Sequence, residues 1–142
     1  MKNLIYLCLL AVTTNAAELI KLDKKFVHAL GWVESRNNPS AVGDSGRAVG
    51  EFQIWKSYWS DAIEYAPEIG GEYKDCYNSE YALKIITSYF NRYAKEAIRK
   101  NDFETLSKLH NGGPSWRKKS TDVQNKLNSY WGRVKNQLDG VK

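Results

Sequence analysis

Apolar residues recur every three or four positions in several segments of this 142-residue chain. That spacing places them on one face of an α-helix. In the first segment the apolar stripe is Leu19, Leu22, Phe26, Leu30 and Val33. The pattern predicts about five helices, over residues 19–36, 57–66, 79–100, 102–110 and 121–138.

Helix boundaries are suggested by residues that cap helix ends. Ser57 is a suitable N-cap for the second helix, and Pro67 lies just beyond its end. "NDFE", which begins at Asn101, and "TDVQ", which begins at Thr121, both have the spacing of a capping box. These signals predict a break after residue 100 and a final helix that starts at Thr121.

A loop rich in turn-forming residues follows the first helix. Residues 35–50 read "SRNNPSAVGDSGRAVG" and contain Pro39 and three glycines, too many helix breakers for a helix. A small irregular hairpin or loop is therefore expected there. No internal repeat, low-complexity tract or linker interrupts the remainder. The predicted fold is mainly α, as a single domain.

The N-terminus has the features of a secretory signal peptide. Lys2 precedes nine apolar or weakly polar residues, from Leu4 to Val12, and small residues close the segment at Ala16 and Ala17. Nine residues are too few to span a bilayer, which takes about 20. We therefore expect residues 1–17 to be removed and residues 18–142 to be secreted, extracellular or periplasmic, without stable membrane insertion. A retained N-terminal anchor is the alternative.

Charge and cysteine content narrow the possible partners. Twenty-one Lys and Arg against 16 Asp and Glu give a net charge of +5, or +4 without Lys2. A small positive charge suits an anionic surface such as a bacterial envelope, although proteins with neutral partners also carry it. No basic run is long enough to indicate nucleic acid. Only Cys76 remains after removal of Cys8, so we expect no internal disulfide, and no Cys and His cluster predicts a metal or cofactor.

Two acids are the candidate catalytic residues. Glu34 follows Leu30 by four positions and so lies at the edge of the apolar stripe, where burial would raise its pKa. Asp44 lies in a polar loop flanked by glycine, where its charge stays solvated. One protonated and one ionised carboxyl are what cleavage of a glycosidic bond requires.

Simpler interpretations of these residues remain open at this point. A Glu at a helix edge is commonly a surface residue, and Gln53 between Phe52 and Ile54 could bond only to backbone. "HNGGP", which begins at His110, could be only a helix stop. The aromatic segment "WKSYWSDAIEY" could belong to the core, although Trp and Tyr faces also stack on sugars.

Several motifs in order resemble the lysozyme-like superfamily. "ESRNNPSAV" followed by "GRAVGEFQI" is similar to the first motifs of the lytic transglycosylase domain. "GEFQIWKSYWSDA", "SYFNRYA", "LHNGGPSW" and "SYWGRV" resemble invertebrate-type lysozymes, so that the similarity covers residues 27–134. The resemblance implies a compact lysozyme-like helical fold with a cleft for the alternating amino sugars of peptidoglycan.

The resemblance also implies roles for individual residues. Glu34 matches the catalytic acid of both branches, and Asp44 is the candidate second carboxylate. Transglycosylases lack that Asp, and the substrate's own N-acetyl group replaces it. The implied substrate-binding residues are Gln53, Tyr58, Trp59, Tyr89, Tyr93, His110, Asn111, Gly112 and Gly113.

The chain departs from the invertebrate-type pattern in two ways. Val49 and Ala62 replace cysteines of the disulfide-rich family, so packing alone must stabilise the domain. Asp44 lies ten residues after Glu34 instead of twelve, which leaves its catalytic match open.

The sequence thus predicts a secreted muramidase that cuts the β-1,4 bond of peptidoglycan with Glu34 as general acid. A lytic transglycosylase using Glu34 alone, with 1,6-anhydro products, is the first alternative. A non-catalytic module that binds cell-wall sugars is the second. We expect a monomer whose partner is peptidoglycan, with no cofactor.

Overall fold

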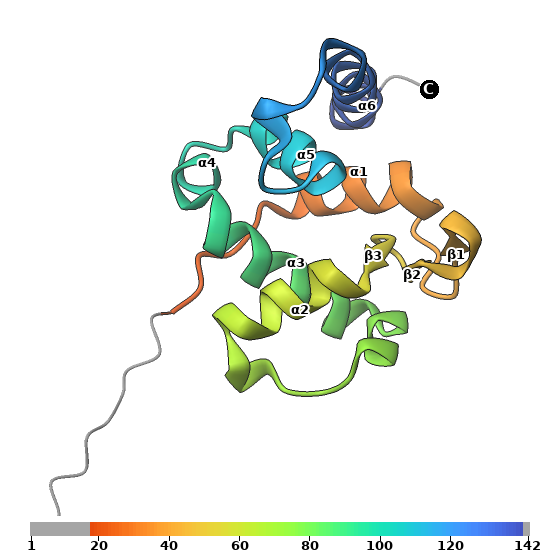
Figure 1. The fold of residues 1–142 in the computed structure, drawn as a ribbon, viewed down its shortest axis with the longest axis vertical. Coiled ribbons are helices and arrows are strands. Elements are labelled where there is room, and N and C mark those ends of the chain that lie inside the picture. Colours follow the sequence, from red (N-terminus) through yellow and green to blue (C-terminus); the bar gives the residue numbers. More distant parts are fainter. Residues whose placement is uncertain (1–17, 141–142) are drawn as a thin grey trace, which may run out of the picture.

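The computed structural model describes residues 18–140, and the predicted signal peptide lies outside this range. The described part contains six α-helices and a small sheet (Figure 1). In chain order these elements are α1 (Lys24–Ser35), β1 (Val42–Gly43), β2 (Ala48–Val49), β3 (Ile54–Trp55), α2 (Lys56–Tyr65), α3 (Ser79–Tyr93), α4 (Lys95–Arg99), α5 (Phe103–Gly112) and α6 (Thr121–Leu138). This confirms the predicted mainly α fold with a hairpin after the first helix.

Helix α1 is the central element that carries the candidate acid. Its N-cap is Asp23, whose carboxylate accepts the backbone N–H of Phe26 at 2.9 Å. Phe26 and Leu30 are fully buried on its inner face. The helix ends where Arg36 turns into the left-handed conformation, with φ of 61°. The apolar stripe therefore fixes which side of α1 faces the core.

The three strands form an antiparallel sheet in the order β1-β2-β3. Val42 is paired with Val49, and Val49 with Ile54. Each strand has only two residues, so the sheet is a compact irregular hairpin of the kind expected for this loop. It lies beside the C-terminal end of α1 (Figure 1).

The helices pack in two groups around α1. Helix α2 lies on α3, whereas α6 lies against both α1 and α5 (Figure 1). The shared core contains large, fully buried side chains from several elements: Phe26, Leu30, Phe52, Ile54, Ile85, Ile86, Phe90, Leu106 and Val134. The C-terminal helix is thereby brought against the end of the first one.

The boundaries differ from the predicted ones at several places. Helix α1 begins at Lys24 instead of residue 19, because Asp23 caps it, and α5 ends at Gly112 instead of His110. The helix predicted over residues 79–100 is divided at Ala94 into α3 and α4. The sequence does not indicate this break, because the apolar spacing continues across it and Ala97 and Ile98 remain buried. Helix α2 begins one residue before Ser57. Asp102, not Asn101, caps α5. No capping box begins at Thr121, because the Gln124 amide donates to the carbonyl of Trp116.

No helix among residues 18–140 is both long and apolar enough to cross a membrane. The longest, α6, has 18 residues and alternates buried with exposed positions along its length. Its apolar face is used for packing within the domain.

Candidate active site

Glu34 lies in the last turn of α1, and only 14% of its side chain is exposed. The hydroxyl of Tyr130, on α6, donates a hydrogen bond to Glu34 Oε1. The same oxygen lies 3.5 Å from Nε2 of His110, on α5. Oε2 makes no hydrogen bond with any residue of the described range. One carboxyl oxygen is therefore held by the protein, and the other is available to carry a proton.

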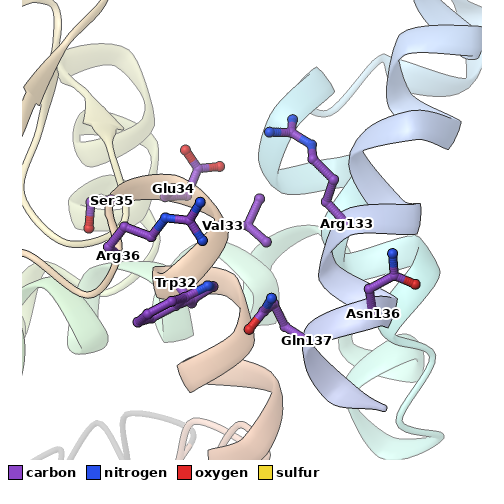
Figure 2. A pocket seen from close by; sticks show the side chains of 8 residues that line it. All are labelled: Trp32, Val33, Glu34, Ser35, Arg36, Arg133, Asn136 and Gln137. Carbon is purple, nitrogen blue, oxygen red and sulfur yellow. The ribbon is translucent and has the colours of Figure 1, made fainter. Parts of the chain in front are cut away.

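Burial raises the pKa of Glu34 to about 7, which confirms the expected direction. The hydrogen bond from Tyr130 and the positive charge of Arg133 oppose this rise, and the negative charge of Asp44 adds to it. Figure 2 shows Arg133 extending from α6 toward the end of α1 that carries Glu34. Near neutral pH the carboxyl is therefore protonated in a large fraction of molecules, as a general acid requires.

His110 is a neutral imidazole beneath Glu34. Burial lowers its pKa to about 4. Nε2 lies 3.0 Å from the carbonyl oxygen of Phe52, which can only accept, so this nitrogen carries the hydrogen. Nδ1 is then the acceptor for the hydroxyl of Tyr58 at 3.1 Å. The contact between His110 and Glu34 is consequently not an ion pair. Through its two hydrogen bonds His110, on α5, is connected to Phe52, just before β3, and to Tyr58, on α2.

Tyr58 and Tyr89 form a buried stack below this imidazole. Their ring centroids are 3.5 Å apart, and Tyr89 is only 2% exposed. This burial argues against the substrate-binding role that the resemblance implies for both: their rings pack in the core, where Tyr58 orients His110. Core packing was the simpler interpretation of the segment that contains Tyr58, and it describes both residues.

The other two aromatic candidates lie in different surroundings. The indole N–H of Trp59 donates to the hydroxyl of Tyr81 at 3.0 Å, so Trp59 packs on the α3 side of α2. Tyr93 is 37% exposed, and its hydroxyl donates to the carboxylate of Asp61 at 3.0 Å. Neither residue contacts Glu34, and of the four aromatic residues only Tyr93 has an exposed ring.

Asp44 belongs to the turn between β1 and β2 and is exposed. Its carboxylate accepts the indole N–H of Trp55 at 3.0 Å, and its backbone carbonyl accepts from the guanidinium of Arg47, also at 3.0 Å. The guanidinium of Arg47 lies 4.8 Å from the centroid of the Trp55 ring. Because Asp44 also acts on the pKa of Glu34, the turn brings both acids to the same region.

Gln53 is fixed under the hairpin by backbone contacts. It has a φ of 49°, and its side-chain amide donates to the carbonyl of Gly50 at 3.0 Å. Its carbonyl oxygen lies where a side chain of Gly43 would be, 2.1 Å from an ideal Cβ. Gly43 has an ordinary extended backbone, so glycine is needed there for space alone. The backbone bond expected of Gln53 is present.

The remaining residues of "HNGG" have separate structural roles. Asn111 is exposed at the end of α5. Gly112 lets Trp116 and Leu127 approach, since an ideal Cβ would lie 2.8 Å from Trp116 Cβ. Gly113 has a φ of 78° and ends the helix. The segment is both a helix stop and the carrier of His110.

Ser35, next to the candidate acid, joins α1 to the segment after β2. Its hydroxyl donates to the carbonyl of Glu51 at 2.7 Å and accepts the backbone N–H of Asn38 at 2.9 Å. Gly31, one turn earlier, leaves space for Asn37. These contacts fix the end of α1 relative to the loop that carries Asp44.

Tyr130 and Arg133 are site residues that sequence reasoning did not assign. The apolar spacing of the predicted helix over residues 121–138 indicates only a buried position for Tyr130. The two residues are three positions apart and so project from neighbouring positions of α6. The motif "SYWGRV" contains both and was the available signal, but only the crossing of α6 over α1 gives them a role.

The described residues contain neither a cluster suited to a metal ion nor an activated thiol. No group of three His, Cys, Asp or Glu residues among them could hold a metal ion. Cys76 is a buried free thiol, and burial raises its pKa to about 12. A thiol in this environment is a poor nucleophile.

A helical body with a three-stranded sheet after the first helix, and a buried acid at the end of that helix, places the chain in the lysozyme-like class, of the invertebrate type. The chain belongs to the Destabilase family, whose model matches residues 23–137.

Individual lysozymes support this assignment. The chain is 34% identical over 86 residues to a lysozyme of Meretrix lusoria, covering 60% of this chain and 63% of that protein. It is 32% identical over 91 residues to a lysozyme of Ostrea edulis, covering 62% and 58%, respectively. For lysozyme 1 of Crassostrea virginica the match is 30% over 89 residues, covering 62% and 44%. The chain thus spans less than two thirds of each of these relatives.

A solved structure shares the fold over most of its length. It is the crystal structure of Meretrix lusoria lysozyme in complex with Aeromonas hydrophila PliI. The TM-score is 0.55 at 26% identity, and the alignment covers 76% of this chain and 89% of the other.

Proposed function

We propose that the protein is a secreted muramidase that hydrolyses the β-1,4 bond between N-acetylmuramic acid and N-acetylglucosamine in peptidoglycan. The observation that carries this proposal is the buried Glu34 carboxyl, whose pKa is raised to about 7 and whose Oε2 makes no hydrogen bond within residues 18–140. The lysozyme names of the relatives support the choice of substrate.

In the proposed reaction Glu34 transfers its proton to the glycosidic oxygen as the bond to the sugar carbon breaks. The departing sugar leaves as an alcohol, and positive charge develops on the remaining ring. Asp44, exposed and acting on Glu34 through its charge, would stabilise this charge or bond to the sugar carbon. Water then supplies the hydroxyl group, and its proton returns to Glu34.

A lytic transglycosylase is the second candidate, and one observation favours it. The Asp44 carboxylate is already hydrogen-bonded to the indole of Trp55, and Glu34 is the only buried acid of the pair. In that reaction a hydroxyl of the substrate itself replaces water and gives a 1,6-anhydro sugar. Glu34 would have the same role as general acid.

The test is digestion of purified cell wall, followed by mass spectrometry of the products. Reducing ends support hydrolysis, whereas anhydro products support the transglycosylase. Glu34→Gln should lower the rate by about 10²-fold or more, because it removes the general acid without changing the shape of the side chain. Full activity of this variant would refute both candidates.

A companion variant, Asp44→Asn, tests the second carboxylate. It keeps an oxygen for the indole of Trp55 but removes the negative charge. A rate close to that of the parent would remove Asp44 from the mechanism. Wall binding without any turnover by the parent protein would favour the sugar-binding module instead.

A further inference from the structure

A pocket of about 420 Å³ lies between the end of α1 and the C-terminal half of α6 (Figure 2). It is lined by Trp32, Val33, Glu34, Ser35 and Arg36 from the first helix and its cap, and by Arg133, Asn136 and Gln137 from α6. Glu34 forms one edge, so whatever occupies the pocket lies beside the candidate acid. None of the roles assigned above uses Arg36, Asn136 or Gln137.

The pocket has an excess of positive charge. Arg36 and Arg133 line it, and Glu34 is the only acid among its lining residues. Neither arginine makes an ion pair with another residue of the range 18–140. Two helix C-termini contribute a negative potential equivalent to about half a charge each, which the two guanidinium groups exceed. The site remains cationic as long as Glu34 is protonated.

The two guanidinium groups are held against aromatic rings. Arg36 lies 5.0 Å from the centroid of the Trp32 ring, and Arg133 lies 5.4 Å from that of Tyr130. Stacking of this kind limits the positions of a long side chain and leaves its N–H groups available to a ligand. The amides of Asn136 and Gln137 add both donors and acceptors.

We infer that this pocket binds a carboxylate of the peptide stem attached to the muramic acid of the substrate. Planar guanidinium groups match carboxylates in bidentate geometry, and neighbouring amides match peptide N–H and C=O groups. The inference rests on the proposed function, because it assumes that a peptidoglycan strand lies at Glu34. A stem of two residues spans about 7 Å, enough to reach from a sugar at Glu34 into an adjoining pocket.

A pocket of this kind gives the protein a preference for substrate that still carries its peptide stems. A glycan strand without stems would lack the anion and would leave the arginines solvated. The protein should therefore bind and cut stem-bearing strands better than strands stripped of peptide by an amidase.

The experiment compares these two soluble strands as substrates of the parent protein, Arg36→Gln and Arg99→Gln. Arg99 is an exposed arginine on α4, paired with Glu96 and outside the pocket, so its variant controls for the loss of one positive charge. Arg36→Gln should raise KM for the stem-bearing strand about tenfold, leave KM for the stripped strand within about twofold, and leave kcat unchanged for both.

A binding measurement separates this inference from the proposed function. The Glu34→Gln variant lacks the general acid and so binds strands without cutting them. When Arg36→Gln is added to this variant, calorimetry should show about tenfold weaker binding of the stem-bearing strand. Equal losses on both strands, no loss on either, or the same loss from Arg99→Gln would each overturn the inference. Failure of the parent to cut any strand would instead refute the proposed function, while the calorimetric result would still test the pocket.

Discussion

The hydroxyl of Tyr130 is hydrogen-bonded to Oε1 of Glu34, although the two residues are 96 positions apart in the chain. This single bond joins the last helix to the end of the first one at the candidate acid. It lowers the pKa of Glu34 against the larger effect of burial, which raises it to about 7.

Tyr130→Phe should therefore raise the pKa of Glu34 further. The ring remains in the core, but the donor that favours the ionised carboxylate is lost. The alkaline limb of the pH profile of kcat/KM should move upward by roughly half a unit to one unit, and stability should fall by about 1 kcal/mol. Tyr81→Phe, which removes a hydroxyl bonded to Gly70 and Trp59, is the control. Identical profiles for parent and Tyr130→Phe would contradict this account.

Glu34→Gln should increase stability at high pH. The folded-state pKa of about 7 exceeds the ordinary value of 4.5, so the folded protein holds this proton more tightly than the unfolded chain. The free energy of unfolding then loses this contribution as pH rises from about 4.5 to 7. Above pH 7 the parent should be less stable than Glu34→Gln by roughly 3 kcal/mol, and near pH 4.5 the two should agree.

Urea unfolding of both proteins at pH 4.5 and pH 8 measures this difference. Other titrating groups are common to the two proteins, so they cancel in the comparison. A constant gap between the two curves across this range would show that Glu34 does not titrate with a raised pKa.

His110 should produce a pH dependence of the opposite sign. Its folded-state pKa of about 4 lies below the ordinary 6.5, so the unfolded chain binds the proton first. Its contribution to the free energy of unfolding is complete above pH 6.5 and is lost as pH falls toward 4. In the Glu34→Gln background this loss is no longer opposed by Glu34. A titration of the His110 ring by NMR should find it neutral at pH 6, and a charged ring at that pH would refute the assignment.

Gly43→Ala should displace Gln53 and destabilise the hairpin. An ideal Cβ at Gly43 lies 2.1 Å from the side-chain oxygen of Gln53, so the end of that side chain must shift and its bond to Gly50 is weakened or lost. A loss of about 1 kcal/mol, the value of one hydrogen bond, is expected, because the atom that must move is the end of a flexible side chain. Adding Gln53→Ala should recover part of it, because the crowded atom is then absent. Additive losses in this double-mutant cycle would show that the two sites are independent.

Gly132→Ala should have the opposite effect on stability. This glycine lies inside α6, has no positive φ, and has no heavy atom within 4 Å of an ideal Cβ. Alanine favours a helix interior over glycine by about 1 kcal/mol. A higher midpoint of thermal unfolding is expected, and a lower one would indicate a neighbour that restricts this position.

The type and order of most elements, and the place of Glu34 at the edge of a buried stripe, could be predicted because they follow from local patterns. The stripe of α1 placed Glu34 at its edge, and the glycine-rich loop indicated the hairpin. The residues that surround Glu34 could not be predicted in this way. Tyr130 and His110 come from α6 and α5, and no local sequence pattern shows how these helices pack against α1. Tyr58 and Tyr89 illustrate the same limit: an aromatic stripe has one pattern whether it faces a core or a ligand.

The one thiol in the described residues, at Cys76, is buried and protonated at physiological pH. Nothing in this part of the chain requires oxidation to hold its shape, so its folding is independent of the redox state of its surroundings. Reducing agents that open disulfide-stabilised proteins should leave this domain folded. A domain built in this way would tolerate thiol-rich surroundings.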